Sequence, residues 1–92
     1  MEFEGIIIED LGVREGSGKN GNWKAAGYVA ETEERNPQRV VFDVWDGMDG
    51  RIERFNLQVG KKYKLYLSFE ASEHEGKWYN RITVWGARLI ES

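Results

Sequence analysis

The stretch that decides the fold is YKLYLSFEASEHEGKWYNRITVW, which runs from Tyr63 to Trp85. It contains two runs of alternating apolar and polar residues, and a period of two is typical of strands that bury one face. The dipeptide Glu75-Gly76 lies between the runs and suits a tight reversal. The stretch therefore predicts an antiparallel hairpin.

The register of this hairpin follows from its turn. With Glu75-Gly76 at the reversal, the pairs on the face expected to be buried are Phe69 with Ile82, Leu67 with Val84 and Leu65 with Gly86. The pairs on the outer face are Glu70 with Arg81, Ser68 with Thr83 and Tyr66 with Trp85. A shift by one residue would mix core with surface side chains, whereas this register separates them and pairs opposite charges. We therefore expect the rings of Tyr66 and Trp85 to lie side by side on the outer face.

Two interpretations of that exposed ring pair stay open. A loop, the helical segment or a second copy of the chain would cover it in a purely structural role. Alternatively, it would offer a stacking surface to planar groups such as bases, at roughly 1–3 kcal/mol for each stacked base.

The remaining sequence predicts one all-β domain over residues 1–92. β-Branched and aromatic residues cluster in short runs separated by glycine-containing segments, which is typical of small all-β proteins. The strands are expected at residues 3–13, 23–31, 39–45, 62–72 and 78–90, with a short helical segment at 51–57. A bulge is expected near Asp10-Leu11-Gly12, where the alternation breaks, and residues 15–22, EGSGKNGN, are expected to form a loop.

Alternation also predicts the faces of the third strand. The residues expected to point inward are Val40, Phe42 and Val44, and those expected to point outward are Val41, Asp43 and Trp45. On the second strand the buried face is either Ala26-Tyr28-Ala30 or Ala25-Gly27-Val29, and the pattern does not choose between them.

Charge and cysteine content narrow the functional classes. The net charge is −3, and the first 50 residues hold 11 acidic and 5 basic residues while the last 42 hold 5 acidic and 8 basic ones. A basic patch on the second half is compatible with this balance, because salt screens charges more than about 10 Å apart at 0.1 M. The absence of cysteine excludes disulfides and thiolate metal sites, and it fits a cytoplasmic protein. Since the sequence opens MEFEGIII, we expect neither a signal peptide nor a membrane span.

Three segments carry a resemblance to a known family: NWKAAGYVAETEERNPQRVVFDVW, RFNLQVGKKY and EGKWYNRITVW. They resemble short uncharacterised bacterial and phage OB-fold proteins, which are grouped by fold with single-stranded-DNA-binding proteins. Five strands with a helical segment between the third and fourth are also the layout of an OB-fold, a Greek-key barrel. The resemblance covers residues 4–90 and implies binding on the second and third strands, flanked by loops at 15–22 and 74–77.

Transferred to this chain, the resemblance suggests a sequence-tolerant site for single-stranded DNA. The rings expected to stack on bases are Trp23, Trp45, Trp78 and Tyr79, and the cations expected to contact phosphates are Lys24, Arg39, Lys77 and Arg81. Asp43 departs from this pattern, since a carboxylate in the middle of a phosphate-binding face lowers affinity.

The main alternative is a protein-interaction or assembly module in which Tyr66 and Trp85 are buried at a subunit contact of a homo-oligomer. Carbohydrate or another small ligand is a further alternative, because OB barrels bind all these classes. We expect no enzyme activity, cofactor or metal site. The single histidine, His74, lies between Glu73 and Glu75, and adjacent strand residues point to opposite faces instead of converging on one ion.

Overall fold

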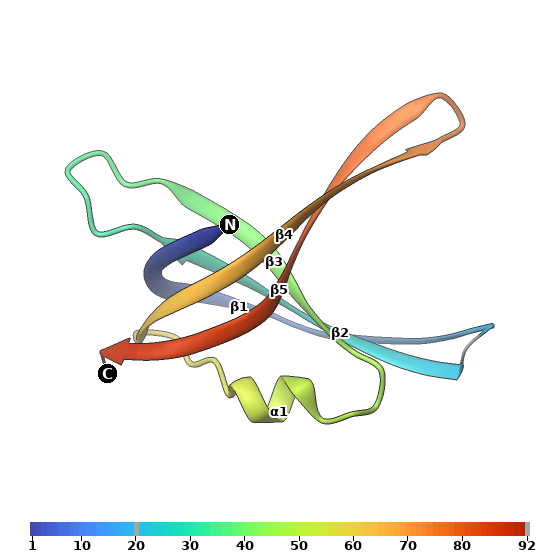
Figure 1. Ribbon diagram of the computed structural model, residues 1–92, viewed down its shortest axis with the longest axis horizontal. Helices are drawn as coiled ribbons and strands as arrows, with labels where there is room; N and C mark the ends of the chain where they lie inside the picture. The colour runs from blue at the N-terminus through green and yellow to red at the C-terminus, as the bar shows by residue number, and fades with distance from the viewer. Residues whose placement is uncertain (20, 92) are drawn as a thin grey trace.

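The computed structural model describes residues 1–19 and 21–91 and confirms an all-β protein with little helix (Figure 1). The elements are β1 (Glu2–Gly18), β2 (Gly21–Glu31), β3 (Arg39–Asp46), α1 (Arg51–Phe55), β4 (Lys62–His74) and β5 (Lys77–Glu91). Across the described residues, no helix is long and apolar enough to cross a membrane.

The five strands form one sheet that closes on itself in the order β1-β2-β3-β5-β4. All neighbours in this ring are antiparallel except β3 and β5, which close it through one parallel pair, Asp43 with Thr83. The short helix α1 connects β3 to β4 and lies below the strands in Figure 1. Its apolar residues Ile52 and Phe55 pack against the core, which compensates for its small length, since an isolated helix of one turn is unstable.

The core fills the inside of the closed sheet and answers the question left open for the second strand. Its buried members are Ile7, Ala26, Tyr28, Ala30, Phe42, Val44, Leu57, Tyr63, Leu65, Leu67 and Val84. The inward face of β2 is therefore Ala26-Tyr28-Ala30. The alternation predicted for the third strand is confirmed, because Phe42 and Val44 are buried while Val41 is exposed.

The β4–β5 hairpin confirms the predicted turn and the register next to it. Glu75 and Gly76 have φ angles of 52° and 80°, as a two-residue turn with two left-handed positions requires. The predicted pairing holds from His74 with Lys77 as far as Leu67 with Val84.

Beyond that point the predicted register is wrong. Tyr66 pairs with Gly86, and Leu65 with Ala87, because the ladder shifts by one residue between Tyr66 and Leu67. The extra residue on β5 is Trp85. The rings of Tyr66 and Trp85 nevertheless lie side by side, with centroids 5.1 Å apart.

Two further predictions are corrected at the ends of the hairpins. Phe69 has the predicted parity, but its side chain is 55% exposed, because β4 and β5 leave the closed sheet there and continue as a two-stranded ribbon. Most of the predicted loop at 15–22 is strand, with pairing as far as Gly18 with Gly21; Asn20 lies outside the described residues. The bulge expected in the first strand is confirmed, since the β1–β2 register shifts between Asp10 and Gly12.

These extensions give the molecule two projecting hairpins. We call residues 16–19 and 21–23 the β1–β2 arm, and residues 69–82 the β4–β5 arm. Both arms leave the closed sheet on the same side of the molecule and diverge from each other (Figure 1).

Candidate functional site

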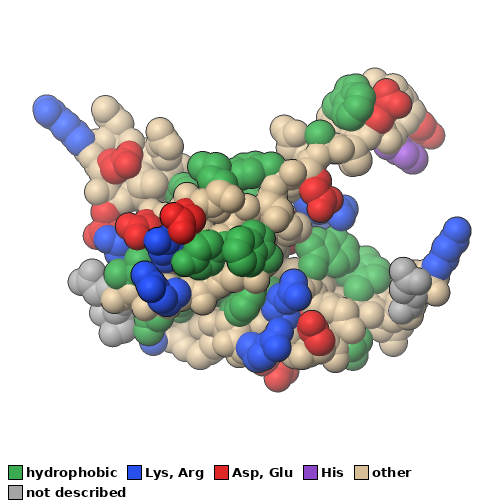
Figure 2. Space-filling model, viewed as in Figure 1, with side chains coloured by type: hydrophobic (Ala, Val, Ile, Leu, Met, Phe, Trp, Pro, Cys, Tyr) green, Lys and Arg blue, Asp and Glu red, His purple; other side chains and the backbone are tan. Residues whose placement is uncertain are grey.

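A groove of about 410 Å³ lies where the two arms meet the outer face of β3. Its lining residues come from β1, β2, β3 and β5: Arg14, Trp23, Val41, Asp43, Trp45, Asn80, Arg81 and Ile82. Figure 2 shows the space between the arms open to solvent. A flexible, elongated ligand could therefore enter between the arms and reach the floor formed by β3.

Two tryptophans and an arginine form the centre of this groove. The ring centroids of Trp23 and Trp45 are 4.8 Å apart at an interplanar angle of 44°, and the Arg81 guanidinium carbon lies 4.9 Å from the Trp45 centroid. Contacts of this kind contribute about 0.5–1.5 kcal/mol between rings and about 0.5–1 kcal/mol between an exposed cation and a ring. The cluster therefore combines stacking surface with positive charge.

Glycines opposite Trp23 and Tyr66 explain how these two aromatic side chains lie flat on the sheet. Gly16 is the cross-strand partner of Trp23, and a Cβ atom there would come 2.7 Å from Trp23 Cε2. Gly86 is the partner of Tyr66, and its Cβ would come 3.1 Å from Tyr66 Cδ2. In both places the missing side chain leaves room for a ring, a known use of glycine within strands.

The indole nitrogen of Trp45 is buried and has no hydrogen-bond partner among the described residues. A buried donor without an acceptor costs about 1–3 kcal/mol. Packing against Trp23 and Arg81 offsets part of this cost.

The charge of the groove differs from the sequence-based expectation at Asp43. Its Oδ1 atom accepts a hydrogen bond from Arg14 Nη2 at 3.0 Å, so the carboxylate is neutralised within the protein. Arg81 forms no ion pair within the described part of the chain. The groove thus keeps a net positive charge at Arg81, next to the tryptophans.

The other predicted cations are spread around the molecule. Lys24 points to the opposite face of β2 from Trp23, with its Nζ 3.8 Å from Glu15 Oε1, and lines a neighbouring hollow of about 320 Å³. Arg39 donates to Glu31 at 2.7 Å near the far end of β3, about 20 Å along the strand from Trp45.

The remaining predicted site residues are Lys77, Trp78 and Tyr79, at the tip of the β4–β5 arm. The two rings are 69% and 52% exposed, and neither lines the groove. Of the eight residues predicted to contact nucleic acid, the structure therefore brings three together at the groove: Trp23, Trp45 and Arg81.

Sequence reasoning missed the groove residues Arg14, Asn80 and Ile82. Arg14 follows two register shifts in β1, which obscure its face in the sequence pattern. Asn80 and Ile82 share the parity of the buried Val84, but they lie at the edge of the closed sheet, where Ile82 is only partly buried against the core and Asn80 is exposed, and both line the groove. A groove wall on the predicted core face could not be recognised from alternation alone.

A second hollow of about 250 Å³ adjoins the groove. It is lined by Trp45, Arg51, Glu70, Arg81, Thr83, Val84 and Trp85. Trp45 and Arg81 belong to both surfaces, so the two are continuous across these side chains.

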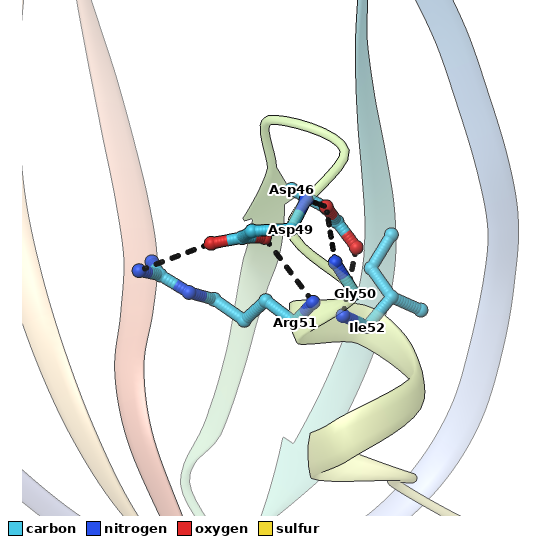
Figure 3. A network of polar contacts seen from close by, with 5 residues as sticks. All are labelled: Asp46, Asp49, Gly50, Arg51 and Ile52. Carbon is cyan, nitrogen blue, oxygen red and sulfur yellow. Dashed lines mark hydrogen bonds and ion pairs between the residues drawn. The ribbon is translucent and has the colours of Figure 1, made fainter.

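Asp46 fixes the loop that leads into α1, whose first residue is Arg51 (Figure 3). Asp46 is buried, with only 4% of its surface exposed. The carboxylate of Asp46 accepts backbone hydrogen bonds from Ile52 at 3.1 Å, Asp49 at 2.9 Å and Gly50 at 3.2 Å. The hydrogen bond from Ile52, helped by those from the loop, lowers the pKa of Asp46 to about 2 although burial opposes the change. Asp46 thus ties the end of β3 to the start of α1.

No three His, Cys, Asp or Glu side chains of the described residues gather where they could hold a metal ion. The arrangement consists of ring faces and guanidinium groups on a groove, which suits binding of planar, negatively charged ligands.

The sequence matches a family model described as a domain of unknown function, DUF3127, over residues 2–88. A comparison with curated proteins finds no match.

Proposed function

The chain belongs to the DUF3127 family, and we propose that it is an OB-fold protein that binds single-stranded nucleic acid without strong sequence preference. The proposal concerns the groove between the arms, and it involves binding only, with no chemical step.

The layout of the strands supports an OB-fold. Such folds are five-stranded Greek-key barrels, and they bind oligonucleotides on strands two and three between the loop joining strands one and two and the loop joining strands four and five. Here a five-stranded sheet closes on itself, α1 lies between β3 and β4, and the long arms are the β1–β2 and β4–β5 connections.

The observation that carries the proposal is the cluster of Trp23, Trp45 and Arg81 in the groove. A base stacking on an aromatic ring gains about 1–3 kcal/mol, and every base has a ring face, so such binding tolerates any sequence. Arg81 lies over Trp45 and is positioned to pair with a phosphate beside the stacked base.

The arms would extend this contact. Lys77, Trp78 and Tyr79, at the tip of the β4–β5 arm, offer a cation and two exposed rings to a strand that continues beyond the groove. Lys24 lies on the opposite face of β2 from Trp23 and is paired with Glu15, and we assign it no role in binding. Arg39 is already paired with Glu31 away from this surface, and we assign it no role in binding.

Titration of a fluorescently labelled oligo-dT by fluorescence anisotropy, over a series of salt concentrations, tests this proposal. Affinity should fall as salt rises, with a slope of log K against log salt near −0.7 for each phosphate contact. Trp23→Ala should weaken binding by about 5- to 150-fold, the equivalent of 1–3 kcal/mol.

Arg81→Gln should reduce the magnitude of the salt slope by about 0.7, because one phosphate contact is lost. Arg39→Gln is the matched control: it removes the same charge from a distant part of the sheet and should leave the slope unchanged. Absence of binding at micromolar protein and about 50 mM salt would contradict the proposed function.

A further inference from the structure

We infer that the bound strand continues past Arg81 into the second hollow, where Arg51 and Arg81 hold a phosphate and Trp85, backed by Tyr66, stacks a further base. This inference rests on the proposed function and extends its path. It gives the Tyr66–Trp85 pair a ligand-binding role instead of a role in assembly.

The groove and the second hollow adjoin each other. They share Trp45 and Arg81, so a strand that leaves the Trp23–Trp45 floor would pass over these two side chains to reach Trp85. Arg81 and Trp85 both belong to β5, which carries the path from one hollow to the next.

The exposed ring of Trp85 also supports this path. It is 58% exposed, and its centroid lies 5.1 Å from that of Tyr66 at an interplanar angle of 38°. Tyr66 in turn lies over Gly86. Trp85 is therefore supported from behind by a fixed ring while much of its own surface faces solvent, which is the arrangement of a stacking platform.

The charges of the hollow favour a phosphate as well. Two guanidinium groups, Arg51 and Arg81, line it against one carboxylate, Glu70. The closest acidic partner of Arg51 is Asp49 at 4.0 Å, the limit of an ion pair, and the backbone of Arg51 is fixed by its hydrogen bond to Asp49 Oδ1 (Figure 3). Positive charge between two tryptophan rings suits a phosphate that joins two stacked nucleotides.

The same charges argue against a subunit contact at this place. The centres of protein–protein interfaces are depleted in charged residues, because burying them is costly. Trp85 shares its hollow with three charged side chains, Arg51, Glu70 and Arg81, so a polyanion fits this surface better than an apolar partner.

The test compares oligo-dT of about four nucleotides with oligo-dT of about twelve, both within the roughly 4–16 nucleotides that a single OB-fold binds. Anisotropy is measured for the wild type and for Trp85→Ala, Trp85→Phe, Arg51→Gln and Leu89→Ala. Leu89 is the control, because it is an exposed apolar residue on the same strand that lines neither hollow. Circular dichroism of each variant establishes that it is folded.

We expect Trp85→Ala to weaken binding of the long oligonucleotide by about 5- to 150-fold and of the short one less than about twofold. Trp85→Phe should keep much of the affinity, because a ring face remains. Arg51→Gln should reduce the salt slope for the long oligonucleotide by about 0.7. Leu89→Ala should match the wild type.

Three results would overturn the inference. If the wild type binds both oligonucleotides and Trp85→Ala leaves the long one unaffected, the path is wrong while the proposed function stands. If light scattering shows a wild-type dimer that Trp85→Ala converts to a monomer, Tyr66 and Trp85 form a subunit contact. A wild type that binds neither oligonucleotide rejects the proposed function as well.

Discussion

Replacing Gly16 with alanine should displace Trp23, whereas the same replacement at Gly18 should have no such effect. A Cβ atom on Gly16 would lie 2.7 Å from Trp23 Cε2, and ordinary contact begins at 3.4 Å, so the ring must retreat by at least 0.7 Å. Trp45 lies against the same ring at 4.8 Å, so this movement must disturb the aromatic cluster. At Gly18 nothing lies within 4 Å of the added atom.

The expected energies follow from this difference. Neither glycine has a positive φ, so the backbone at both positions accepts alanine. Gly18→Ala should be neutral or should stabilise the fold by up to about 1 kcal/mol, because alanine lowers the conformational entropy of the unfolded chain. Inserting a methyl group into packed surroundings costs about 1–3 kcal/mol, so Gly16→Ala should be less stable than Gly18→Ala by about that amount. For a domain of this size each kcal/mol lowers the midpoint of thermal unfolding by about 4–8 °C.

Three measurements check this prediction on both variants. Thermal unfolding gives the difference in stability, near-ultraviolet circular dichroism reports the geometry of the Trp23–Trp45 pair, and oligo-dT titration reports binding. We expect only Gly16→Ala to change the dichroism signal and to weaken binding. Equal melting midpoints and identical spectra for the two variants would show that Trp23 does not lie over Gly16.

Three other substitutions test separate parts of the structure. Leu67→Ala should lower the free energy of unfolding in urea titrations by about 2–5 kcal/mol, and Phe69→Ala by about 1 kcal/mol or less. The reason is that Leu67 is 2% exposed whereas Phe69 is 55% exposed, and equal losses would place Phe69 in the core. Asp43→Asn should release Arg14 and increase the magnitude of the oligonucleotide salt slope by about 0.7, and an unchanged slope would contradict this. Because the pKa of Asp46 falls from 3.8 to about 2, its contribution is fully present above pH 3.8 and is lost towards pH 2. The wild type should therefore exceed Asp46→Asn in stability at pH 7 by more than at pH 3, and a gap independent of pH would refute the role of the carboxylate.

Much of the closed sheet could be predicted because alternation and turn chemistry act locally. The turn at Glu75-Gly76 fixed the pairing of Phe69 with Ile82 and of Leu67 with Val84. The alternation of β3 likewise placed Phe42 inside and Trp45 outside.

The register beyond Leu67 could not be predicted from alternation, because the extra residue at Trp85 shifts the following pairs of the hairpin by one residue. A signal was present nonetheless: Gly86 leaves space for the Tyr66 ring, and a glycine within an apolar strand often marks such a place. Gly16 is the same case on β1, where a glycine-rich stretch suggested a loop but instead accommodates Trp23.

Which residues line the groove depends on where the closed sheet ends along β4 and β5. That position is a property of the whole fold. Alternation continues unchanged through Ile82 and Asn80, although Ile82 is only partly buried against the core and Asn80 is exposed. Arg14 was missed for a related reason, since two shifts in β1 separate it from the regular part of the strand.

The two hairpins that project beyond the ring have a consequence for how this family can diverge. Trp78 and Tyr79, near the outer end of the longer one, are mostly in solvent, so changing them perturbs folding little. Changes in the length and side chains of these tips can therefore be tolerated while an unchanged interior keeps the protein folded.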